Sequence, residues 1–186
     1  MSQQRPVIAV LVGSLSKDSI NRKLAQALEK LVGPRAEFRY VRLDDLPVYN
    51  RDVDSNYPAA FNRLKQDIES ADAVLFVTPE NNRSIPAVLK NAIDIASRPW
   101  GKNSFASKPG AVIGTSTGAM STALAQQHLR NICVFLDIAM LAQPEAFVRY
   151  HEGLIAADAS VADENTRSFL AGFIDRYLAW IERHRA

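Results

Sequence analysis

The sequence has a single cysteine, Cys133, among its 186 residues. A lone cysteine cannot form a disulfide within its own chain, so a hydrophobic core has to hold the fold, and hydrophobic residues make up 47% of the sequence. Cys133 lies in the apolar run ICVFL, which favours a buried structural thiol over a nucleophile. Any redox chemistry therefore has to come from a cofactor.

Long apolar runs and long basic runs are also missing. No window approaches the roughly 18 continuous apolar residues of a membrane-spanning helix, and no apolar segment precedes the first predicted strand. Lysines and arginines are scattered, and the formal net charge is +2, so neither a nucleic acid nor a membrane is expected as a partner. We expect one cytoplasmic domain, residues 1–186.

Two nucleotide-binding motifs are absent as well. The sequence has neither the G-x-x-x-x-G-K-[ST] of nucleotide triphosphatases nor the G-x-G-x-x-G of dinucleotide folds. Both magnesium-dependent phosphoryl transfer and a Rossmann-type NAD site therefore lose support.

Predicted strands alternate with predicted helices along the chain. Apolar or alternating runs predict strands at 6–12, 36–43, 71–78, 108–117 and about 135–140. Helical spacing of apolar residues predicts helices at 20–32, 58–71, 86–98, up to about 131, and from about 163 to the C-terminus. This alternation indicates a flavodoxin-like, doubly wound α/β fold: a five-stranded parallel sheet in the order 2-1-3-4-5 with helices on both faces.

Polar loops follow three of the predicted strands, at 13–21, 80–84 and 115–121. In this sheet order ligands bind beyond the carboxyl ends of the strands, at the switch between strands 1 and 3. We therefore expect the three loops to form one ligand site.

The first loop, GSLSKDSIN, has the chemistry of an anion site. Hydroxyl and amide donors stand at Ser14, Ser16, Ser19 and Asn21, and Lys17 adds a flexible cation. Ser19 can also cap the next helix, whose free N–H groups and partial positive charge favour a phosphate. The alternative interpretation is that these serines only cap a helix and close a turn.

Two further segments make the pattern specific: PENNRSIPAVLKNAIDIASRP at 79–99 and AQQHLRNICVFLD at 125–137. Together with GSLSKDSIN they resemble the NADPH-dependent FMN reductase family, flavodoxin-like bacterial quinone, azo and chromate reductases. That family typically carries G-S-L-R-x-x-S-x-N, P-E-Y-N-x-S-[IV]-P-G-x-L-K-N-A-x-D-x-x-S-R and H-L-R-x-x-L-x-F-L-D.

The resemblance implies a set of cofactor-binding residues. Its phosphate loop corresponds to Ser14, Ser16, Lys17, Ser19 and Asn21. Its P-E-Y-N turn, which edges the flavin ring and ribityl chain, corresponds to Pro79, Glu80, Asn81 and Asn82, with Ser84 nearby. Its loop after the fourth strand, which borders the ring, corresponds to Ser116, Thr117 and Gly118.

The activity implied by the resemblance is hydride transfer from NADPH or NADH to bound FMN, followed by ping-pong reduction of a small-molecule acceptor such as a quinone. Hydride transfer requires orientation more than acid–base chemistry, so no catalytic residue and no metal site is expected. The resemblance also implies a homodimer or homotetramer, with residues 85–95 and 123–132 as candidate contacts. His128 has no second metal ligand at a suitable spacing, which favours a structural or interface role.

Several positions depart from the family pattern. Ser16 replaces an arginine and Asp18 adds a carboxylate near the expected phosphate, while Asn81 replaces the tyrosine of P-E-Y-N. Arg83 occupies a variable position, and Ala87 replaces a glycine. The departures at Ser16, Asp18 and Asn81 leave open a family member that has lost FMN. A separate alternative is a flavodoxin-like electron carrier without its own NAD(P)H activity, although such carriers are usually strongly acidic and this chain is slightly basic.

Overall fold

The computed structural model describes residues 5–185. Its strands are β1 (Val7–Val12), β2 (Glu37–Tyr40), β3 (Ala73–Val77), β4 (Pro109–Ser116), β5 (Ala139–Met140) and β6 (Ala146–Arg149). Its α-helices are α1 (Ile20–Val32), α2 (Ala59–Glu69), α3 (Ala87–Ala96), α4 (Ala123–Phe135) and α5 (Glu164–His184). Within the described part of the chain, no helix is long and apolar enough to cross a membrane.

All strand pairs in the sheet are parallel, in the order β2-β1-β3-β4-β5, with β6 also paired to β4. The predicted flavodoxin-like order is therefore confirmed. The chain moves outward from β1 to β2 and then crosses to β3 on the other side of β1, so the switch point lies between β1 and β3.

The fifth position of the sheet differs from the prediction, because two short strands share it. β5 pairs with the start of β4, at Pro109 and Gly110, whereas β6 pairs with its end, from Ile113 to Ser116. The predicted strand from 135 to 140 is wrong in its first part, because α4 continues to Phe135. Ala125, Leu129 and Cys133, spaced four residues apart, are all buried and so extend the helical face past the predicted end at residue 131.

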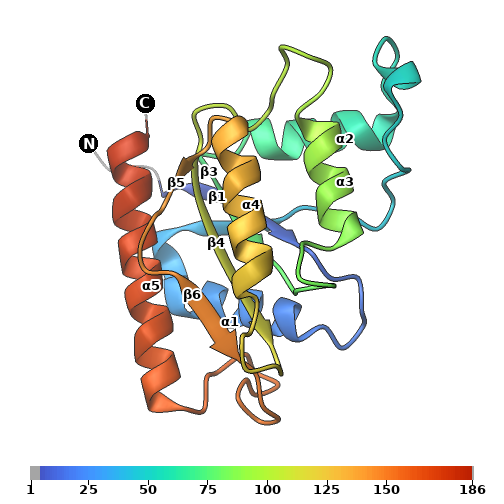
Figure 1. The fold of residues 1–186 in the computed structure, drawn as a ribbon. Helices are drawn as coiled ribbons and strands as arrows, with labels where there is room; N and C mark the ends of the chain where they lie inside the picture. Colours follow the sequence, from blue (N-terminus) through green and yellow to red (C-terminus); the bar gives the residue numbers. More distant parts are fainter. Residues whose placement is uncertain (1–4, 186) are drawn as a thin grey trace.

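The sheet is buried on both faces. In β1, Ile8, Val10 and Val12 belong to one core cluster with α1 and α5, whereas Ala9 and Leu11 belong to a second cluster with α2, α3 and α4. Figure 1 shows this arrangement, with α5 and α1 on one side of the sheet and the other three helices on the opposite side. Because side chains alternate along a strand, a strand covered by helices on both faces is apolar throughout.

Candidate functional site

The loops after β1, β3 and β4 meet at the carboxyl edge of the sheet, as predicted. The N–H of Gly13 donates to the carbonyl of Val77 at 2.9 Å, and the N–H of Thr78 donates to that of Ile113 at 3.0 Å. Gly114 fits between the last two loops only because it has no side chain: a Cβ there would lie 2.1 Å from the carbonyl oxygen of Thr78. The three loops therefore form one continuous rim.

The loop after β1 leaves its polar groups free. Ser14 is half-buried and residues 15–18 are exposed. Within residues 5–185, the side chains of Ser14, Ser16 and Lys17 make no hydrogen bond, and no backbone N–H from residue 14 to 18 donates to another protein group. A ligand with several acceptor oxygens is the natural partner for such a set of donors.

Ser19 and Asn21, from the same motif, are instead bound to the protein. Ser19 is buried and caps α1, because its Oγ accepts from the N–H of Arg22 at 3.1 Å, as its expected capping role requires. The side-chain amide of Asn21 is 1% exposed and pairs with the backbone of Thr115 in both directions, each bond being 3.0 Å long. Asn21 therefore joins the loop after β1 to the end of β4, a role that the motif alone did not reveal.

The chain makes a tight turn at residues 81–84, which begins within the P-E-N-N segment. The backbones of Asn81 and Ser84 exchange two hydrogen bonds of 2.9 Å, and Asn82 and Arg83 between them have φ values of 51° and 64°. Two successive left-handed residues are typical of a type I′ turn. This geometry fixes the positions of all four residues at the end of β3; Pro79, which precedes them, lies beside Gly13.

Glu80 lies in this segment and caps a distant helix. Its Oε2 accepts from the backbone N–H groups of Leu124 and Ala125, both at 3.0 Å. Thr122, the residue at the N-cap position of α4, makes no capping bond with its own side chain, so Glu80 supplies the missing acceptor. No local pattern in the sequence predicts this contact, because the two residues are 44 positions apart.

The loop after β4 completes the rim. Ser116 is half-buried, its Oγ accepts from the N–H of Gly118 at 3.2 Å, and its carbonyl accepts from Tyr150 at 2.8 Å. Thr117 and Gly118 are exposed. Their accessible backbone groups can face a planar ligand at this edge.

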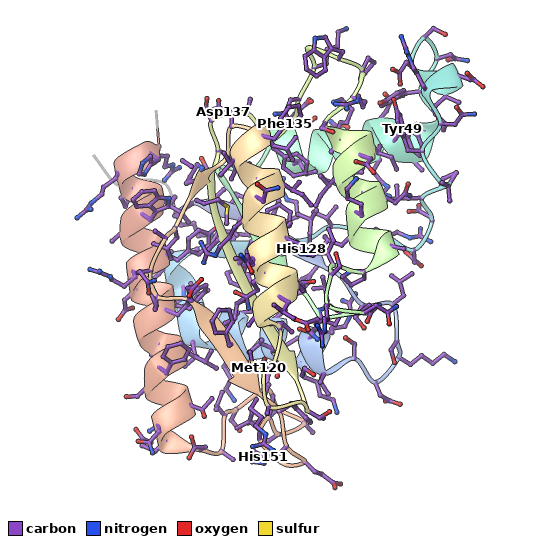
Figure 2. The ribbon with its side chains drawn as sticks, in the orientation of Figure 1. Tyr49, Met120, His128, Phe135, Asp137 and His151 are labelled. Carbon is purple, nitrogen blue, oxygen red and sulfur yellow. The ribbon has the colours of Figure 1, made fainter. Side chains whose placement is uncertain are left out.

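A hollow of about 640 Å³ opens beside the turn, between α3 and α4. Its lining residues are Asn81, Asn82, Ser84, Ile85, Ala87, Lys90, His128, Asn131 and Ile132. His128 lies on α4 (Figure 2). Its Nδ1 is 3.0 Å from the Ser84 Oγ. Sequence reasoning assigned His128 a structural or interface role and did not connect it with the turn.

Several other polar or reactive side chains have mainly structural surroundings. Cys133 is fully buried, and this burial raises the pKa of its thiol to about 12, so it is a poor nucleophile, as expected. Lys90 pairs with Asp94 at 2.7 Å, and Asn91 holds the 44–57 loop by bonding the N–H of Tyr49. Trp100 follows the C-terminal end of α3, opposite the three loops, and is 77% exposed.

The unbonded donors after β1 also provide a test of the expected cofactor. A phosphate needs several donors at one place, and free N–H groups, serine hydroxyls and Lys17 lie together at the start of the 13-residue helix α1. Asp18 is exposed and, among the described residues, makes no ion pair, which leaves its carboxylate free to turn toward solvent. The residues present therefore fit the phosphate end of FMN.

The sheet order and the loops at its carboxyl edge define a flavodoxin-like fold, in which three polar loops meet at the switch point. The sequence pattern of the NADPH-dependent FMN reductase family matches residues 6–153, and the chain belongs to this family. A 2-hydroxy-1,4-benzoquinone reductase from a Burkholderia species is 49% identical over 178 residues, 96% of this chain and 97% of the relative. A quinone reductase from Pseudomonas putida is 43% identical over 180 residues, 96% of each chain.

A solved structure shares both sequence and fold with this chain. FerB, a flavoenzyme NAD(P)H:acceptor oxidoreductase from Paracoccus denitrificans, is 49% identical and superposes with a TM-score of 0.94 over 97% of this chain and 100% of its own. The chain is accordingly an enzyme, an NAD(P)H-dependent oxidoreductase with FMN as its cofactor.

Proposed function

We propose that this enzyme passes hydride from NADPH or NADH through FMN to a quinone, donor and acceptor using the same site in turn. The observation that carries the proposal is that the loop of free donors and the turn at residues 81–84 follow two neighbouring strands, β1 and β3, at one edge of the sheet. A hollow of about 640 Å³ opens beside the turn. The quinone reductases among the relatives support the choice of acceptor. Azo compounds, chromate and free flavin also accept electrons from a reduced flavin and are alternative acceptors.

In this proposal the loop after β1 holds the phosphate of the cofactor. Ser14, Ser16 and Lys17 contact the phosphate directly, because their polar groups have no partner among residues 5–185. Ser19 orients α1 through its cap, and Asn21 fixes the loop against β4. A phosphate placed there also gains from the partial positive charge of the helix, by roughly 0.3–1 kcal/mol at an exposed site.

The two remaining loops orient the flavin ring. The residues proposed to border it are Pro79, Glu80, Asn81, Asn82, Ser84, Ser116, Thr117 and Gly118. Bound FMN supplies the reversible two-electron chemistry that the side chains lack. The protein positions the reactants. The turn, fixed by its backbone hydrogen bonds, holds the flavin ring so that the nicotinamide or the quinone can lie at the near-attack distance of about 3–3.5 Å.

A reconstitution experiment tests the function. The apoprotein is titrated with FMN, and the loaded protein is then assayed for NADPH and NADH oxidation with benzoquinone, without any protein partner. Yellow, tightly bound FMN and steady-state quinone reduction with ping-pong kinetics are expected. A protein that binds no FMN would contradict the proposal, as would one that binds FMN but needs a protein partner for turnover.

The proposal includes a homodimer or homotetramer. The hollow beside the turn continues as a groove between α3 and α4. At the end of the groove away from the turn, the bordering side chains are apolar: Trp100, Val134 and Phe135 are 77%, 76% and 67% exposed. Large apolar side chains exposed together are typical of interfaces. Sedimentation at the mass of a single 20.6 kDa chain would contradict this part of the proposal.

We also propose that residues 1–186 act as one FMN-binding domain in the cytoplasm, where nicotinamide donors are supplied. Residues 1–4 and 186 of that domain lie outside the described part of the structure. Neither a nucleic acid nor a membrane is proposed as a partner, since the charges of the sequence are scattered.

A further inference from the structure

An imidazole lies at the polar end of the α3–α4 groove. His128 is exposed on α4, and its Nδ1 is 3.0 Å from the Oγ of Ser84. Ser84 is itself held by two backbone bonds of 2.9 Å to Asn81, so the ring is tethered to a rigid turn. Within residues 5–185, the other ring nitrogen, Nε2, has no hydrogen-bond partner. The contact at Nδ1 thus orients the ring, and Nε2 remains accessible to a ligand in the hollow.

His128 and the turn border the same hollow. The hollow is lined by Asn81, Asn82 and Ser84 from the turn and by His128 from α4. Figure 2 shows His128 between α4 and α3, away from α5. A reactant that enters this hollow therefore meets the imidazole at the edge where the flavin ring is proposed to lie.

The chemistry of the proposed acceptor requires a second proton. Conversion of a quinone to a hydroquinone takes two electrons and two protons, whereas a hydride supplies two electrons and one proton. The remaining proton has to reach the oxygen on which negative charge develops. Histidine is the side chain most often used for such a transfer near neutral pH.

Building on the proposed function, we propose that His128 donates this proton and that Ser84 is the positioning residue that orients it. In the doubly protonated ring, the Nδ1–H donates to the Ser84 Oγ. The N–H bond at Nε2 breaks as an O–H bond forms on the quinone oxygen that would otherwise become a phenolate, and a neutral imidazole is left. Nε2 then regains a proton from solvent, to which the exposed ring has access.

The charged groups around the hollow are compatible with this role. From α3, Lys90 faces the hollow but its ammonium is paired with Asp94 at 2.7 and 2.8 Å. From the turn, Glu80 is committed to the N–H groups at the start of α4, and Arg83 is exposed. From α4, Arg130 bonds the carbonyl of Leu141 in the segment between β5 and β6. No carboxylate is among the lining residues, so none competes for Nε2.

The test compares an acceptor that takes up protons with one that does not. His128→Asn keeps a polar group near Ser84 and removes the transferable proton. In stopped-flow reoxidation of the reduced protein, we expect the rate with benzoquinone to fall by about 10- to 100-fold. This loss reaches the lower end of the effects typical of general acids. The rate with ferricyanide, which takes an electron and no proton, should change by less than about twofold.

Three further measurements separate proton donation from a structural role. The benzoquinone rate of the unaltered protein should fall with rising pH as the proton donor is lost, and this pH dependence should disappear in His128→Asn. The FMN dissociation constant of the apoprotein should be unaffected by His128→Asn. In the oxidised protein, added hydroquinone should shift the NMR signals of the His128 ring.

Two variants complete the design. Ser84→Ala should lose part of the benzoquinone rate, and His184→Asn, at the far end of α5, should lose none. An unchanged benzoquinone rate in His128→Asn, or an equal loss with both acceptors, would overturn the inference. If the proposed function itself is wrong, the unaltered protein will already fail to reduce benzoquinone with NAD(P)H, so the two failures are distinguishable.

Discussion

The loop after β1 and the turn after β3 carry the two strongest sequence signals of the site, and they are built in opposite ways. In the loop, Ser14, Ser16 and Lys17 make no hydrogen bond to the described protein. In the turn at residues 81–84, Asn81 and Ser84 are bonded through their backbones and Ser84 also through its side chain, and Glu80, just before the turn, is bonded through its side chain. The loop thus leaves its donors for a ligand, whereas the backbone of the turn is fixed by bonds within the protein.

The same contrast divides the GSLSKDSIN motif itself. Residues 15–18 are exposed, and the side chains of Ser14, Ser16 and Lys17 make no hydrogen bond within residues 5–185, but Ser19 and Asn21 are buried and bonded within the protein. In the proposed function, the residues of this one motif have two roles: Ser14, Ser16 and Lys17 contact the phosphate, and Ser19 and Asn21 hold the loop in place. Substitutions in the first group should change affinity, and those in the second group should change stability.

The largest expected effect comes from Asn21→Ala. This change leaves the N–H and the carbonyl of Thr115 buried without partners, and each such loss costs about 1–3 kcal/mol. We expect the unfolding free energy of the apoprotein to fall by about 2–4 kcal/mol, measured by urea denaturation.

Asn165→Ala is the matched control, because Asn165 is exposed in the first turn of α5. Its unfolding free energy should stay within about 0.5 kcal/mol of the unaltered protein. If Asn21→Ala were as stable as this control and lost only FMN affinity, Asn21 would belong with the free donors and the division of the motif would be wrong.

A smaller loss of stability is expected for Glu80→Ala. The variant removes the acceptor for two N–H groups at the start of α4, and loss of a helix cap costs about 0.5–2 kcal/mol. Glu80→Gln retains one acceptor oxygen without the charge and should fall between the two. Guanidinium denaturation of the apoproteins measures this order; equal stability of all three proteins would show that Glu80 does not hold α4.

The fold and the location of the site could be predicted because they depend on local patterns. Buried strands, helical spacing and polar loops at strand ends are each visible within about ten residues, and the parallel topology then brings the loops to one edge. The contacts that define individual roles could not be predicted in this way. Asn21 meets Thr115 across 94 residues, and Glu80 meets Leu124 across 44.

The fifth sheet position illustrates a different limit. The run ICVFLDIAM is apolar enough for a strand, and its first part continues α4 because Cys133 lies on the buried helical face set by Ala125 and Leu129. Packing against the sheet, and not the composition of the run, decides where the helix ends. The separate strand β6 then forms only where β4 offers a free edge beyond β5.

The smallest expected effects are on FMN affinity and lie in the loop. Ser14→Ala removes one neutral donor, worth about 0.5–1.5 kcal/mol, so the FMN dissociation constant should rise about two- to tenfold while apoprotein stability is unchanged. Ser16→Arg adds a guanidinium fork suited to phosphate and should lower the same constant by a similar factor. Fluorescence titration of the apoproteins with FMN measures both changes.

Riboflavin, which has the same ring but no phosphate, is the control ligand for both variants. If the free donors after β1 bind the phosphate, the affinity for riboflavin should be the same in the unaltered protein, Ser14→Ala and Ser16→Arg. Parallel changes in the two affinities would mean that the loop contacts the ring or acts through the fold. The free donors would then have lost the role that distinguishes them from the turn, because both segments would serve the cofactor by shaping its ring site.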